Sequence, residues 1–159
     1  LSGTKTGFSD NSFDLVIARY SLRHSPNWKN MIREMLRVSN GAVLIEEPID
    51  SDRNENKIIK RKAWDYYLDL QREIGEYHAP HFELQVLTGF LDKLNLNYTV
   101  EVRETDETIG FDDFFYLHDR YAKKSKHYDY HKNRLEIFRR EIAGGQLCGD
   151  DMVYLEINK

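Results

Sequence analysis

The sequence predicts an α/β fold whose central strands are parallel. Two short and nearly continuous apolar runs, Phe13–Tyr20 and Ala42–Glu46, have the composition of strands buried in such a sheet. Between them lies a segment whose apolar residues recur at helical spacing. A strand, a crossover helix and a second strand within about 35 residues form a βαβ unit, which is right-handed with few exceptions.

The first strand is expected over Phe13–Tyr20, after the polar turn Ser9–Ser12, and is expected to be buried on both faces. Ser25-Pro26 then predicts the start of a helix, because serine caps helices and proline is tolerated at the first helical position. The apolar face of this helix carries Trp28, Met31, Ile32, Met35 and Leu36. Asn40-Gly41 is expected to end the helix, since glycine and asparagine favour the left-handed conformation found there.

The second strand is expected over Ala42–Glu46, and Pro48 is expected to stop it because proline cannot donate to a strand ladder. Open α/β sheets bind ligands at the carboxyl ends of their parallel strands. The segments Ala18–His24 and Glu46–Pro48 should therefore border a binding site.

Beyond Pro48 the sequence alternates further between helical and strand patterns. We expect a helix over Asn54–Gly75, a loop over Glu76–His81 and a second helix over Leu84–Leu94. These are followed by a strand with one solvated face over Tyr98–Val102, a pair of helices within Phe111–Arg140 and a last strand over Met152–Ile157.

The bulk composition is that of one soluble domain. The chain has 159 residues, a net charge of −4 and a single cysteine, Cys148. No disulfide framework can form within it, so a cytoplasmic location is the simplest expectation. No apolar run is long enough for a transmembrane helix. Acidic residues concentrate in 101–119 and basic ones in 120–140, a pattern typical of solvated helix faces.

Four segments together carry a resemblance to a known family. Phe8–Val16 and Ala18–His24 resemble the approach to the fourth strand, and the end of that strand, in class I S-adenosylmethionine-dependent methyltransferases of the ubiquinone/menaquinone-biosynthesis type (methyltransferase type 11). Arg33–Val38 resembles the crossover helix of that family, and Asn40–Ile45 resembles its glycine turn and fifth strand. Beyond these segments only the order of elements agrees with the family.

The resemblance implies a Rossmann-like methyltransferase sheet, C-terminal part, with helical inserts. Residues 1–159 would form a partial methyltransferase domain, with a lid insert at 54–82 and a helical insert at 110–148 before the last strand. The family's glycine-rich cofactor loop does not occur in the sequence, and Ser2 or Gly3 stands near the place of an acidic residue that contacts the adenine side. We therefore expect the chain to hold one wall of the cofactor site and to be inactive by itself.

The resemblance also implies roles for individual residues. The methionine end of S-adenosylmethionine would lie against Ala18, Arg19 and Tyr20. The candidate catalytic residues are His24, as a general base, and Glu46, as a carboxylate that orients a nucleophile. The candidate substrate-binding residues of the lid are Trp64, Tyr67, His78 and His81. Strand-end packing, a solvated carboxylate and an aromatic core are the structural alternatives for these positions.

The expected partner is a small-molecule acceptor, with neither a membrane nor a metal. The pairs His78/His81 and His127/His131 have metal-binding spacing, but no cysteine or well-placed carboxylate completes either set. Two other functions stay open: a non-catalytic binding module, and an RNA methyltransferase that uses the basic stretch Lys123–Tyr128, although the net charge argues against nucleic acid. An unpaired edge on the first strand predicts self-association into a homo-oligomer.

Overall fold

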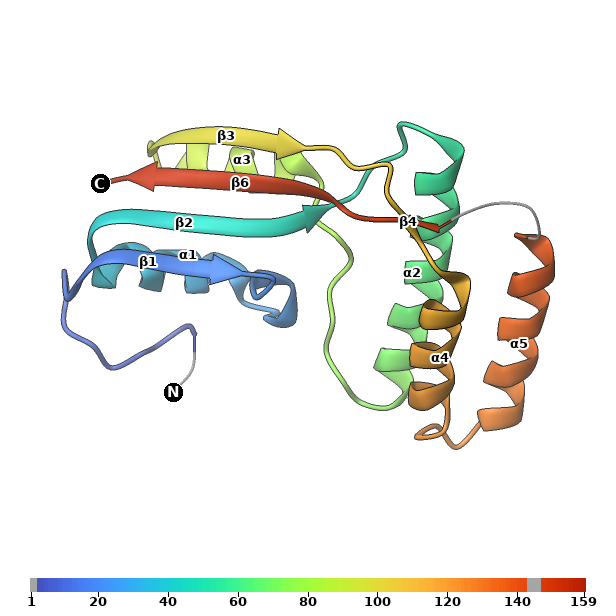
Figure 1. Ribbon diagram of the computed structural model, residues 1–159. Helices are drawn as coiled ribbons and strands as arrows, with labels where there is room; N and C mark the ends of the chain where they lie inside the picture. Colours follow the sequence, from blue (N-terminus) through green and yellow to red (C-terminus); the bar gives the residue numbers. More distant parts are fainter. Residues whose placement is uncertain (1–2, 143–146) are drawn as a thin grey trace. The chain divides into compact units, whose positions relative to one another are not determined.

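A computed structural model describes residues 3–142 and 147–159 (Figure 1). Ser2 and part of the 110–148 insert therefore lie outside the described residues. The chain divides into two compact units. The sheet unit comprises 1–50, 81–104 and 151–159, and the helical unit comprises 51–80 and 105–150. Both expected inserts fall almost entirely within the helical unit.

The sheet unit is built on four strands: β1 (Phe13–Arg19), β2 (Ser39–Ile49), β3 (Asn97–Arg103) and β6 (Asp151–Asn158). Their order in the sheet is β1-β2-β6-β3 (Figure 1). Strands β1 and β2 are parallel, with Ala18 opposite Ile45, whereas β6 runs antiparallel to both of its neighbours. The predicted adjacency and parallel direction of the first two strands are confirmed.

Helices α1 (Trp28–Val38) and α3 (Leu84–Lys93) both lie on one face of this sheet (Figure 1). The buried core residues that they share with the strands include Ile32, Met35, Val43, Ile45, Leu87, Leu91, Val153, Leu155 and Ile157. On β1 only this face is buried: Ala18 is 3% exposed, but Leu15 and Ile17 are 47% and 61% exposed. The expectation of a first strand buried on both faces is therefore wrong for the described residues.

The boundaries of α1 differ from their prediction. A short 3-10 turn, η1 (Leu22–His24), precedes α1, and the helix begins after Asn27 instead of at Ser25-Pro26. Its last turn leads directly into extended Ser39, without a left-handed residue. Gly41 serves a different purpose, because a Cβ atom there would lie 2.5 Å from the carbonyl oxygen of Asp14. The glycine permits the close approach of β2 to β1.

Pro48 lies inside β2 and does not end it. The strand continues to Ile49, with Pro48 opposite Met152 of β6. The last pair between β1 and β2 joins Arg19 to Glu46. Pro48 therefore has a paired strand on one side only, and a missing N–H is tolerated where one side of the backbone needs no partner.

The helical unit contains α2 (Glu55–Glu73), α4 (Phe111–Ala122) and α5 (Tyr128–Glu141), with the two-residue strands β4 (Thr108–Ile109) and β5 (Leu147–Cys148). The side chain of Asn54 accepts a hydrogen bond from the Lys57 N–H at 3.0 Å and caps α2. The antiparallel β4–β5 pair was not predicted, since two residues are too short to show alternation. Among the described residues no helix is both long and apolar enough to cross a membrane.

Candidate functional site

The chain leaves β1 in a tight turn at the sheet edge where ligand-binding residues were expected. Tyr20 has a φ of +50°, in the left-handed region that residues with side chains rarely occupy. Its backbone N–H donates to the carbonyl oxygen of Glu46 at 2.9 Å, which ties the turn to β2. Such a conformation costs about 1–3 kcal/mol, and strain of this kind is concentrated at functional sites. We call residues 20–22 the Tyr20 turn.

The ring of Tyr20 is held by three side chains. The guanidinium carbons of Arg19 and Arg23 lie 5.5 and 5.6 Å from the ring centroid, within range of a cation–π interaction. The Tyr20 hydroxyl lies 3.3 Å from the sulfur of Met152 on β6. These contacts give the turn a fixed aromatic surface with positive charge beside it.

Glu47 is the buried acidic residue beneath this turn. It is fully buried, and one carboxylate oxygen accepts hydrogen bonds from the backbone N–H groups of Ser21 and Leu22, at 2.6 and 2.7 Å. Burial raises the pKa of Glu47, while these two hydrogen bonds and the charge of Arg23 act in the opposite direction. Its other oxygen, Oε2, has no hydrogen-bond partner within the described part of the chain.

Glu46, the predicted catalytic carboxylate, is engaged on the opposite face of β2. Its Oε2 forms an ion pair with Nε of Arg19 at 2.9 Å, and its Oε1 lies 3.4 Å from the Tyr154 hydroxyl. Successive side chains of a strand point to opposite faces, so the carboxylates of Glu46 and Glu47 lie on opposite faces of the sheet. The sequence analysis selected Glu46 as the candidate carboxylate and did not identify the hydrogen bonds of Glu47 to the turn.

His24 and Ala18 have different exposures. His24 ends η1 and is exposed, and its pKa is lowered by partial burial and by the charge of Arg23. Its imidazole is therefore mostly uncharged at neutral pH, which is the form in which a histidine can act as a base. Ala18 packs into the core with α1. Its side chain is covered, so a ligand at the strand end would meet its backbone.

The segment before α3 brings His81 to this site. Nη1 of Arg23 lies 3.2 Å from Nε2 of His81. Arginine can only donate, so Nε2 of His81 accepts this hydrogen bond and the proton of a neutral ring sits on Nδ1. Arg23 is a second residue that sequence reasoning did not single out. Its distance from His81 in the sequence gives no local signal of the contact.

Three of the four predicted lid residues lie together in the helical unit, whereas His81 belongs to the sheet unit. The ring of Trp64 lies 4.9 Å from that of Tyr67 and 5.4 Å from that of His78. Tyr67 is buried and also contacts the rings of His118 and Tyr121, at 5.0 and 5.4 Å. The predicted group of four is thus divided between the two units.

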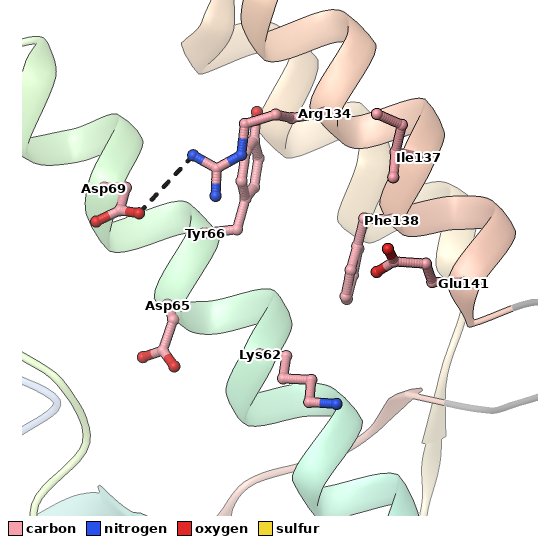
Figure 2. A pocket seen from close by; sticks show the side chains of 8 residues that line it. All are labelled: Lys62, Asp65, Tyr66, Asp69, Arg134, Ile137, Phe138 and Glu141. Carbon is pink, nitrogen blue, oxygen red and sulfur yellow. Dashed lines mark ion pairs between the residues drawn. The ribbon is translucent and has the colours of Figure 1, made fainter.

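A groove of about 400 Å³ runs between α2 and α5 within the helical unit (Figure 2). Its lining residues are Lys62, Asp65, Tyr66, Asp69, Arg134, Ile137, Phe138 and Glu141. The guanidinium of Arg134 lies over the Tyr66 ring, 4.7 Å from its centroid, and pairs with Asp69 at 3.8 Å. Charges of both signs surround an apolar wall, and no single ligand chemistry is indicated.

The two histidine pairs with metal-binding spacing have different surroundings. His78 belongs to the helical unit and contacts the ring of Trp64, whereas His81 lies 3.2 Å from Arg23 in the sheet unit. His127 precedes α5 and is exposed, whereas His131 is buried and hydrogen-bonds Glu73 at 2.6 Å. Within residues 3–142 and 147–159, no three histidine, cysteine or acidic side chains form a group that could hold a metal ion.

Comparisons with known proteins bear on the family and the fold. Residues 1–45 match a family model described as a methyltransferase domain. No curated protein has a significantly similar sequence. Among solved structures, all of this chain aligns with the YcgJ protein from Bacillus subtilis, with 18% identity, a TM-score of 0.61 and 69% of that chain covered.

Two further structures are similar in fold. A cyclopropane-fatty-acyl-phospholipid synthase-like protein from Lactobacillus casei has 13% identity and a TM-score of 0.69, with 61% of its chain covered. A SAM-dependent methyltransferase from Archaeoglobus fulgidus has 12% identity and a TM-score of 0.52, with 66% covered. Both align over the whole of this chain, which thus spans between about three fifths and about two thirds of their length. The resemblance to class I methyltransferases is confirmed, by the family model over residues 1–45 and by the fold over the whole chain.

Proposed function

We propose that this chain, which has a class I methyltransferase fold, contributes one wall of the cofactor site and the acceptor side of an enzyme that methylates a small molecule. The Tyr20 turn is the observation that supports this proposal. It is a strained and firmly held structure at the carboxyl end of β1, the sheet edge where α/β proteins bind ligands.

The residues at this edge match the chemistry of the methionine end of S-adenosylmethionine. That end carries a carboxylate, an amino group and a sulfonium. Guanidinium groups of Arg19 and Arg23 suit the carboxylate, and the carboxylate of Glu46 suits the amino group. We assign the cofactor wall to Arg19, Tyr20 and the backbone of Ala18.

Methyl transfer makes few chemical demands on the protein. The bound cofactor supplies a methyl group on a sulfonium that is already an activated leaving group, so alignment with the acceptor provides most of the rate. The acceptor's lone pair forms the new bond, and an acceptor that still carries a proton must lose it. His24, exposed and with a lowered pKa, is our candidate for the base that takes this proton.

We retain Trp64, Tyr67 and His78 as candidate acceptor-binding residues. Trp64 and His78 are each half-buried beside Tyr67, so part of the cluster is open to a ligand. Flat aromatic side chains of this kind suit an acceptor that has an apolar or cationic group. His81 belongs instead with Arg23 in the sheet unit.

A non-catalytic binding module is the second candidate. The ion pair between Glu46 and Arg19 occupies the predicted catalytic carboxylate, which favours this alternative. The RNA methyltransferase hypothesis receives less support, because Lys123 and Lys124 of the basic stretch pair with Asp119 and Glu76.

Calorimetric titration of S-adenosylhomocysteine into the full-length protein tests the proposal. We expect saturable binding with a dissociation constant on the order of micromolar, and Arg19→Met should weaken it about tenfold because a charged hydrogen-bond donor is lost. Mass spectrometry of small-molecule acceptors incubated with S-adenosylmethionine should then reveal a gain of one methyl group. Absence of binding at ligand concentrations on the order of millimolar would favour the non-catalytic module.

A further inference from the structure

We propose that Glu47 is a positioning residue, which sets the conformation of the Tyr20 turn and thereby the affinity for the cofactor. The inference rests on the proposed function, because it concerns the same site. Glu47 does not have to touch a ligand for this role. It acts through the backbone of Ser21 and Leu22.

The geometry of the turn leads to this inference. Tyr20 alone in the turn has a positive φ, and the next two backbone N–H groups both point at one oxygen of Glu47. A carboxylate that accepts several backbone N–H groups stabilises the loop that supplies them. The interaction therefore offsets the cost of the left-handed residue and orients the aromatic ring.

The burial of Glu47 matters for its role as the acceptor of these two hydrogen bonds. Glu47 is fully buried, so water cannot replace it as the acceptor for these N–H groups. Leu22, the donor of the second hydrogen bond, is also fully buried and belongs to the core of the sheet unit. The turn is thus attached to the core at one end and to β2 at the other.

The reach of the Glu47 side chain matters more for this role than its charge. Its acceptor oxygen must lie within hydrogen-bond distance of both N–H groups, 2.6 and 2.7 Å away. Aspartate keeps the charge but is shorter by one methylene group. Glutamine keeps the length and one acceptor oxygen but has no charge. These two substitutions separate position from charge.

The experiment measures the affinity of the full-length protein for S-adenosylhomocysteine in the unchanged protein and in Glu47→Gln and Glu47→Asp. Glu47→Gln should stay within about threefold of the unchanged affinity, whereas Glu47→Asp should lose about tenfold or more, because two buried N–H groups lose their acceptor. Backbone NMR adds a readout that needs no ligand. The amide signals of Ser21 and Leu22 should move in Glu47→Asp and stay near their places in Glu47→Gln.

Glu136→Gln and Glu136→Asp are the matched controls. Glu136 is an exposed glutamate on α5 and lies outside the Tyr20 turn. Neither control should change the affinity or the two amide signals. Thermal unfolding identifies any variant that fails to fold. If Glu47→Asp fails, a loss of affinity beyond about threefold in Glu47→Gln would still overturn the positioning role.

Each result has a separate meaning. Equal affinity in all variants would overturn the positioning role and leave the proposed function standing. A loss of affinity in Glu47→Gln with unchanged affinity in Glu47→Asp would show that the charge matters and the position does not, which also overturns it. If the unchanged protein binds no S-adenosylhomocysteine, the proposed function fails and the positioning role fails with it.

Discussion

The sheet unit and the helical unit both bury an ionisable side chain, and they do so in different ways. In the sheet unit, the Glu47 carboxylate accepts two backbone N–H groups of a neighbouring turn. In the helical unit, Nδ1 of His118 lies 2.7 Å from the carbonyl oxygen of Phe114, one helical turn earlier. Nε2 of His118 is buried without a partner in the described residues. One buried group connects separate segments, and the other stays within its own helix.

The surroundings of the two groups differ accordingly. The rings of Phe114, Tyr67 and Tyr66 lie 3.8, 5.0 and 5.8 Å from that of His118. Desolvation by this aromatic environment lowers the pKa of His118 to about 4, although the hydrogen bond to Phe114 partly opposes it. His118 is therefore a neutral core residue at physiological pH. We therefore infer that the buried carboxylate of Glu47 serves the candidate site, whereas the buried ring of His118 serves the packing of the helical unit.

The largest expected effect concerns His118. Its pKa is about 6.5 in the unfolded chain and about 4 in the folded one, so the stabilisation is fully present above pH 6.5 and is lost as the pH falls toward 4. The helical unit should lose about 3 kcal/mol across this range, an upper value from the size of the shift. His118→Gln should reduce that loss, as measured by urea unfolding at several pH values. A pH dependence that is unchanged in the variant would contradict the assignment.

Glu47 should give the stability of the sheet unit the opposite pH dependence. Its pKa is raised in the folded protein, so its contribution to stability is greatest below about pH 4.5 and declines as the pH rises through the raised pKa. Glu47→Gln should flatten this decline. Hydrogen exchange of core amides in β2 and β6, followed between pH 4 and 7, measures the effect separately from the helical unit. A steeper decline in the variant would show that the buried carboxylate is stabilised in its charged form.

The smallest expected effect concerns the open face of β1. Ile17 is 61% exposed, and the described residues provide no second strand beside β1. Apolar side chains on an unpaired edge favour association, so Ile17→Lys should raise the dissociation constant of any self-association by about tenfold or less. Light scattering over a concentration series measures this. Val86→Lys is the control, since Val86 is an exposed apolar residue on α3. A monomer at all concentrations would remove the basis for this prediction.

Much of the sheet unit could be predicted from the sequence because its signals are local. The run Phe13–Tyr20, the apolar positions of α1 and the alternation in Met152–Ile157 each follow from the period of one element. In the helical unit, the helix that starts near Asn54 and the two helices within Phe111–Arg140 were likewise evident from local patterns. The predictions made from Pro48 and Gly41 were wrong, because the role of each residue depends on a neighbouring strand and not on its own segment.

The sequence by itself determined the longer strands and helices, the parallel βαβ unit of β1 and β2, and the sheet edge that carries the candidate site. Only the tertiary structure decided how polar side chains are used there. There Glu46 pairs with Arg19, Glu47 accepts hydrogen bonds from the Tyr20 turn, and His81 contacts Arg23. The physical reason is that apolar periodicity acts over a few residues along the chain. The partner of a buried polar group, by contrast, is set by which distant segments meet.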